Sequence, residues 1–262
     1  MKILKKLRFL LPVLIFALIR FGGLALISLL FSRLFAAWGL TSLNYTLAPG
    51  WAQAVVRCHT PLAYILISLL ICAALKPFLK PKTGRLARGL LLGLLAGGFA
   101  LGMTFLFDSA RVQSGPAIVP ELLLGFLANA AVWMSRAALI AAVYELLPPR
   151  FRKLACLAGL LSVSSILAPA VWLNALLMGL AMTLLYEKDG TRGAACFGAA
   201  AYLFGTLLFA MPNASVYCTP VFTLYHVSDE LLTGGSAGMY CGLWFTLALT
   251  AVNACLILRK KR

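Results

Sequence analysis

Long runs of hydrophobic residues alternate along this chain with short polar and basic segments. An α-helix of about 20 apolar residues, within a range of about 17–25, crosses the hydrocarbon core of a bilayer. The runs that fit this length, or approach it, are residues 9–31, 61–79, 86–107, 121–144, 154–168, 170–186, 193–211 and 237–258. We therefore predict an all-α fold: one transmembrane domain over residues 1–262, built as a bundle of about eight membrane-spanning helices.

The fifth and sixth runs form one continuous apolar stretch, residues 154–186. This stretch is too long for a single crossing, and Pro169, a residue that breaks helices, interrupts it. We interpret it as a tight hairpin of two short helices. The alternative is one kinked, tilted helix, which would leave seven crossings.

The distribution of basic residues favours eight crossings. Cytoplasmic segments of membrane proteins carry an excess of Lys and Arg. With the N-terminus inside and eight crossings, 18 of the 23 Lys and Arg residues fall in cytoplasmic segments, and the outer loops keep only Arg33, Arg57 and Arg111. Seven crossings would move the last two basic clusters outside. We therefore expect a multi-pass cell-membrane protein with both termini in the cytoplasm.

Composition supports a lipid environment and argues against nucleic acid. Hydrophobic residues make up 62% of the chain and charged residues 11%, with a mean hydropathy of +0.96, whereas soluble domains carry about 25% charged residues. The net charge of +16 is divided among short clusters between apolar runs. A nucleic-acid-binding surface would instead concentrate it on one face.

The third predicted helix contains Gly89, Gly93 and Gly97 at intervals of four residues. Small residues at this spacing let two membrane helices approach closely. We expect this face to pack against another helix.

The fourth predicted helix carries the polar residues that interest us most: Asn129, Arg136, Tyr144 and Glu145. Ionisable groups inside a membrane are costly and are candidates for function. Arg136 should face the bundle interior, where Glu145, Asn174 or a backbone carbonyl could accept its hydrogen bonds. It would serve either as a tether between helices or as a ligand contact, and we name Asn129, Arg136, Tyr144 and Asn174 as candidate binding residues.

Several familiar intramembrane chemistries lack an essential part. The chain has two histidines, His59 and His226, and both fall in predicted outer loops. The intramembrane serines therefore have no general base, and no His-Glu-x-x-His string could hold a catalytic zinc. We expect neither a metal nor another cofactor.

The order of segments nevertheless resembles a known family. A basic entry at Arg85 leads into the glycine-rich helix, the fourth helix ends in Tyr-Glu-Leu-Leu-Pro-Pro-Arg at 144–150, and Thr-Gly-Gly at 233–235 precedes the last helix. Over roughly residues 60–258 this is similar to the CPBP family of bacterial intramembrane proteins, also called CAAX-protease-like or Abi. The resemblance implies an eight-helix bundle and, in active members, a glutamate-dependent protease site.

The residues of that site are largely missing here. Active members have Glu-Glu-x-x-x-Arg at the end of the fourth helix and histidines on later helices. The first glutamate position is Tyr144, the second is Glu145 and the arginine position is Pro149, with Arg150 one residue late. No histidine occurs between residues 60 and 225, so Glu145 is the surviving motif residue.

We therefore favour a proteolytically inactive relative, a membrane-embedded protein that binds a peptide or a membrane-protein partner, with an immunity or regulatory role. One alternative is an active endopeptidase whose rearranged site uses Glu145 and Arg150, with Arg136 nearby. A second alternative is a transporter or an export accessory subunit.

Overall fold

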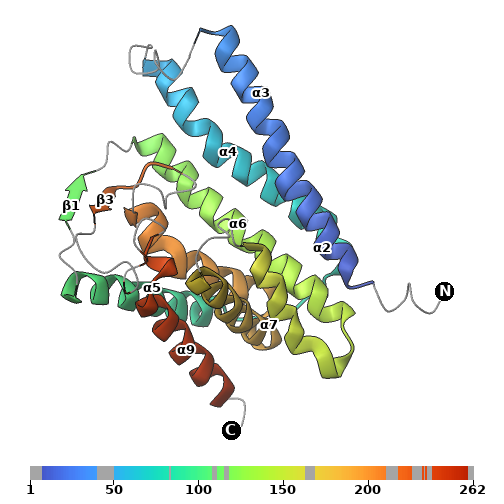
Figure 1. The fold of residues 1–262 in the computed structure, drawn as a ribbon. Coiled ribbons are helices and arrows are strands. Elements are labelled where there is room, and N and C mark those ends of the chain that lie inside the picture. Colours follow the sequence, from blue (N-terminus) through green and yellow to red (C-terminus); the bar gives the residue numbers. More distant parts are fainter. Residues whose placement is uncertain are drawn as a thin grey trace.

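The computed structural model describes residues 8–39, 50–82, 84–107, 111–114, 118–162, 169–210, 218–225, 232, 234 and 238–258. In these residues the chain folds as a helical bundle with a small sheet at one end (Figure 1). The predicted all-α bundle is thus confirmed in its main feature.

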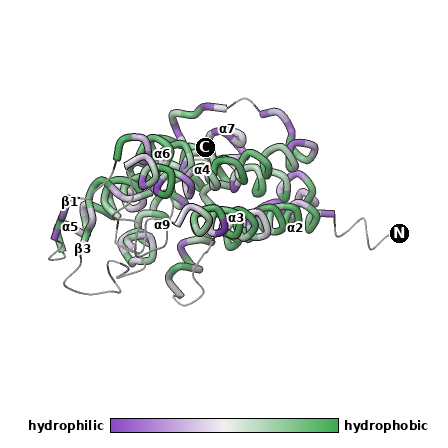
Figure 2. The backbone as a smooth tube through the Cα atoms, turned by 90° about the horizontal axis from the view of Figure 1, so that it is seen from above, coloured by the Kyte–Doolittle hydropathy of each residue, from purple (hydrophilic) through white to green (hydrophobic). Residues whose placement is uncertain are grey.

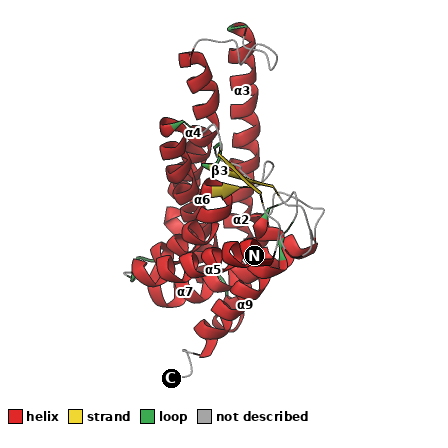
Figure 3. Cartoon of the chain, turned by 90° about the vertical axis from the view of Figure 1, so that its left-hand side faces the viewer, coloured by secondary structure: helices red, strands yellow, loops and turns green. Residues whose placement is uncertain are grey.

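The first helical rod lies at the edge of the bundle. It consists of α2 (Leu10–Ala17), a π-helical turn η1 (Leu18–Gly22) and α3 (Gly23–Ala37), and α4 (Gly50–Leu75) with η3 (Lys76–Phe78) packs beside it. No residue of α3 is buried, and α3 with the first part of α4 projects beyond the other helices (Figures 1 and 3).

Helix α7 (Pro169–Leu203) lies at the centre of the bundle. It contacts α5 (Leu86–Phe107), α6 (Val119–Leu146), the 3₁₀-helix η4 (Pro149–Ser162) and α9 (Leu243–Leu258). Large side chains from α6, α7 and α9 fill the core between them, including Trp133, Tyr186, Phe197 and Phe245.

The helices differ from the predicted runs at several of their ends, and α4 is the main correction. The predicted helix began at residue 61, but α4 begins at Gly50 and continues through Pro61. Arg57 is accommodated within the helix because Glu121 of α6 pairs with it. α5 has the predicted bounds, and α9 begins at Leu243, later than expected.

The apolar stretch at 154–186 is divided into two helices that pack side by side. α7 begins at Pro169, and the backbone of Gly159 in η4 lies against Gly179. Cys156 also contacts Gly179, whereas Gly159 reaches back to Ala175, so the two helices run antiparallel. This is the predicted hairpin, although its first arm is a 3₁₀-helix.

Gly190 breaks α7 into two helical parts, 169–189 and 191–203. Its φ of 67° lies in the left-handed region that glycine adopts without strain. The second part continues into a π-helical turn, η5 (Phe204–Leu208).

The glycine face of α5 packs against the second part of α7, as predicted. A Cβ atom built on Gly89 would lie 2.0 Å from the Gly193 carbonyl oxygen, and one on Gly93 would lie 2.4 Å from the Phe197 carbonyl oxygen. Because contacts advance by four residues on both helices together, α5 and this part of α7 run parallel.

A small sheet, which the sequence analysis did not predict, joins two loops. In the described part of the chain the strands are β1 (Arg111–Ser114), β2 (Phe209–Ala210) and β3 (Phe222–Tyr225), in the order β1-β3-β2. β1 is antiparallel to β3, with Arg111 opposite Tyr225, and β2 is parallel to β3. β1 and β3 lie at the left-hand side of the helical bundle in Figure 1.

The surface of the bundle suits a lipid environment. Among the described residues, four helical segments are long and apolar enough to cross a membrane: Leu10–Ala37, Gly50–Phe78, Leu86–Phe107 and Val119–Leu146. Most of the helical chain is hydrophobic along its length (Figure 2), and leucines such as Leu70, Leu91 and Leu106 are exposed.

Candidate functional site

Glu145, near the end of α6, is the centre of a polar cluster. Its side chain is 6% exposed and pairs with two lysines: Lys80 Nζ lies 2.8 Å from Oε2 and Lys82 Nζ lies 3.2 Å from Oε1. The Tyr186 hydroxyl donates to Oε1 at 2.8 Å. One carboxylate therefore connects α6, the segment between η3 and α5, and α7.

Tyr144 belongs to the same cluster. Its ring meets the Tyr186 ring edge-on at 5.2 Å, and its hydroxyl donates to Glu187 Oε1 at 3.2 Å. Lys82 Nζ lies 4.0 Å from the Tyr186 ring centroid and 5.1 Å from that of Tyr144, a geometry that favours cation–π attraction. We call Lys80, Lys82, Tyr144, Glu145 and Tyr186 the Glu145 cluster.

Arg150 and Arg152, which follow Glu145 in the chain, lie over aromatic rings. Arg150 stacks on Phe151, with Cζ 4.6 Å from the ring centroid, and Arg152 lies over Tyr144. Glu145 pairs with Lys80 and Lys82. Within the described ranges, no group of three His, Cys, Asp or Glu residues could hold a metal ion.

A groove opens beside the Glu145 cluster. Its volume is about 680 Å³, and its walls come from the η3–α5 segment and the start of the second part of α7. We call it the basic groove, and it is lined by Lys76, Leu79, Lys80, Pro81, Lys82, Gly84, Leu86, Thr191 and Arg192. The sequence analysis used these basic residues only as topology signals, since nothing in their spacing shows that they meet.

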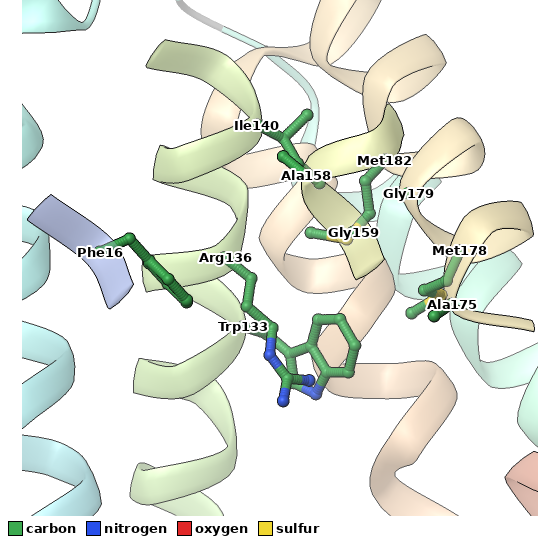
Figure 4. Close-up of a pocket in the computed structure, with 10 residues that line it drawn as sticks. All are labelled: Phe16, Trp133, Arg136, Ile140, Ala158, Gly159, Ala175, Met178, Gly179 and Met182. Carbon is green, nitrogen blue, oxygen red and sulfur yellow. The ribbon is translucent and has the colours of Figure 1, made fainter. Parts of the chain in front are cut away.

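Arg136 occupies a different place, deeper in the bundle. Its guanidinium lies alongside the Trp133 ring, 4.3 Å from the centroid, with Phe16 of α2 nearby (Figure 4). The surrounding pocket, which η4 and α7 complete, has about 10 Å³ available to a water molecule. Glu145 follows Arg136 by nine positions on α6, so their Cα atoms lie about 13.5 Å apart along the helix axis. The two side chains therefore belong to different places in the bundle.

The two candidate asparagines connect helices. Asn129 Nδ2 donates to the Ala199 carbonyl at 2.9 Å, and Asn174 Nδ2 donates to the Tyr240 carbonyl at 2.7 Å. The Thr246 hydroxyl donates to Asn174 Oδ1 at 2.7 Å. In the structure, Asn129 thus links α6 to α7, and Asn174 links α7 to the segment around α9.

A second buried carboxylate, Glu121, lies at the other end of α6. Arg57 Nε donates to its Oε2 at 2.7 Å and the Thr219 backbone N–H donates to Oε1 at 2.5 Å. Burial, with a smaller contribution from the Glu121 charge, raises the pKa of the neighbouring Cys218 thiol to about 12. This arrangement ties α4 and α6 to the loop before β3.

Thr233 and the segments 226–231 and 235–237, which carry part of the family resemblance, lie outside the described residues. Comparison of the chain with models of protein families, with curated proteins and with solved structures found no match.

Proposed function

We propose that this chain is a multi-pass membrane protein on a CPBP-like scaffold, without protease activity, that binds a peptide or a membrane-protein partner. The observation that carries the proposal is the state of Glu145. A general base must reach the water molecule that it activates. Here Glu145 accepts a hydrogen bond from Tyr186 and pairs with Lys80 and Lys82, in a structural cluster.

Within the described part of the chain, Glu145 has lysine and tyrosine partners, and no histidine is among them. The histidine in the described helices is His59, which lies in the first half of α4. Glu145 contacts Lys80, in the segment that follows the end of this helix. An active member would need histidines beside the carboxylate to position water and stabilise charge.

The arrangement of the connecting segments supports eight crossings. The predicted cytoplasmic segments meet at one end, where Lys80 pairs with Glu145 and Arg88 with Asp189. Two predicted outer loops meet in the β1–β3 sheet.

The pocket around Arg136 is the position we propose for partner recognition. A guanidinium buried among apolar side chains at mid-helix is costly, and intramembrane charges of this kind mark functional sites. The walls of this pocket come from α2, α6, η4 and α7. A small displacement of α2, at the edge of the bundle, would therefore widen the pocket.

The test is complementation of a deletion strain by three variants, each verified by immunoblot to accumulate in the membrane. We expect Arg136→Gln to lose the phenotype, and Glu145→Gln and the exposed control Arg150→Gln to keep it. Complete loss with Glu145→Gln at normal accumulation would support a protease and contradict the proposal.

A further inference from the structure

The basic groove lies where two apolar helices end. The candidate span Gly50–Phe78 finishes on one side of it and Leu86–Phe107 begins on the other. Thr191 and Arg192, at the start of the second part of α7, close the third side. A volume of about 680 Å³ lies within the range of about 300–1,000 Å³ that small-molecule sites occupy.

The groove carries more positive charge than the protein itself neutralises. Glu145 pairs with Lys80 and Lys82, and Lys80 remains 64% exposed. Lys76 and Arg192 are exposed and line the groove, and neither has an ion pair within the described part of the chain. The groove therefore attracts an anion from outside.

Apolar side chains continue from the groove into the membrane-facing surface. Leu79 and Leu86 line it, and Leu86 is 47% exposed. Leu90, one helical turn farther along α5 on the same face, is also exposed. A ligand that fits both features has an anionic head and a hydrocarbon tail.

We propose that the basic groove binds the phosphate headgroup of an anionic phospholipid, with an acyl chain along Leu86 and Leu90. Basic pockets between membrane helices on the cytoplasmic side recognise such headgroups through charge. The Thr191 hydroxyl supplies a neutral hydrogen-bond donor at the same site. This lipid site goes beyond the proposed function; it rests on the membrane-spanning arrangement proposed there, but not on Arg136 or on the absence of protease activity.

The test measures binding of fluorescent phosphatidylglycerol and phosphatidylcholine to the purified full chain in a neutral detergent. We expect phosphatidylglycerol to bind the wild type more tightly than phosphatidylcholine. Lys76→Gln with Arg192→Gln should weaken phosphatidylglycerol binding about 25-fold, because each basic group near an anionic lipid contributes about fivefold. Glu145→Gln should strengthen it, because Lys80 and Lys82 lose their internal partner.

The matched control is Lys153→Gln with Lys188→Gln, which removes the same charge at the same end of the bundle but outside the groove. The control should change affinity by less than about twofold. An equal loss of phosphatidylglycerol affinity in both double variants would show that general surface charge causes the binding. Equal binding of the two lipids would show that apolar contact alone causes it. Either result overturns the proposal.

Competition with inorganic phosphate distinguishes a lipid from a soluble anion. We expect millimolar phosphate to displace phosphatidylglycerol only weakly, because it cannot use Leu86 and Leu90. Complete displacement would make soluble phosphate the ligand and overturn the lipid assignment. Each variant is checked for monodispersity, and if the double variant does not fold, Arg192→Gln alone tests the same point with a loss of about fivefold.

Discussion

Glu145 stabilises the contact of three chain segments through one carboxylate. Two of its partners, Lys80 and Lys82, come from the segment before α5, and the third, Tyr186, comes from α7. The buried position of the carboxylate strengthens each of these interactions because water screens them poorly. A structural function at this residue follows directly from its contacts.

Removal of the Tyr186 hydroxyl tests that function. We expect Tyr186→Phe to lower the free energy of unfolding by about 1.5–3 kcal/mol, the contribution of a hydrogen bond to a charged group. Tyr225→Phe is the matched control, since Tyr225 is exposed in β3, and its effect should be close to zero. Equal effects of the two variants in denaturant titrations would show that the Tyr186–Glu145 bond contributes nothing.

The sequence pointed to these polar residues but not to the groups that they contact. Arg136, Asn129 and Asn174 are buried, as expected of intramembrane polar side chains. The sequence also singled out Glu145, but its lysine partners are more than sixty positions away along the chain. No local pattern encodes such a pairing, because it depends on how α6 and α7 meet the η3–α5 segment.

Close backbone contact between α5 and the second part of α7 is the clearest feature at the scale of elements. It requires glycine at positions where any side chain would meet a backbone atom of the other helix. The four-residue spacing of Gly89, Gly93 and Gly97 was enough to predict the contact face. It could not identify the partner helix, whose contacting residues include phenylalanine as well as glycine and alanine.

Gly93→Ala and Gly102→Ala form a matched pair on α5. The new methyl group at 93 would lie 2.4 Å from the Phe197 carbonyl oxygen, whereas at 102 nothing lies within 4 Å. We expect Gly93→Ala to destabilise the protein by about 1–3 kcal/mol through overpacking, and Gly102→Ala to be neutral or slightly stabilising through helix propensity. Thermal unfolding of the purified variants measures both, and indistinguishable melting temperatures would contradict this packing.

At the scale of the whole molecule, the two ends of the bundle differ in chemistry. One end carries the Glu145 cluster, the Arg88–Asp189 pair and the basic groove, and the other carries the Arg57–Glu121 pair and the small sheet. The positions of the helices followed from hydrophobic run length. The sheet and the early start of α4 did not, because each depends on pairing between segments far apart in sequence.

Reporter fusions test the orientation of these two ends. Fusions after Lys153 and Arg192 should report the cytoplasm, and fusions after Gly115 and Pro220 should report the outer side, because the basic segments stay inside. The activity of a paired phosphatase and fluorescent-protein reporter measures each position. A cytoplasmic signal at Pro220 would contradict the eight-crossing arrangement.

The parallel contact of α5 with α7 has a consequence for biogenesis. Gly89 and its partner Gly193 are 104 positions apart in the sequence, so α5 leaves the ribosome well before the helix that covers its glycine face. At a synthesis rate of about 5–20 residues per second, this interval lasts about 5–20 s. During that time the second part of α7 does not yet cover the glycine face of α5, and the bundle can close only late in translation.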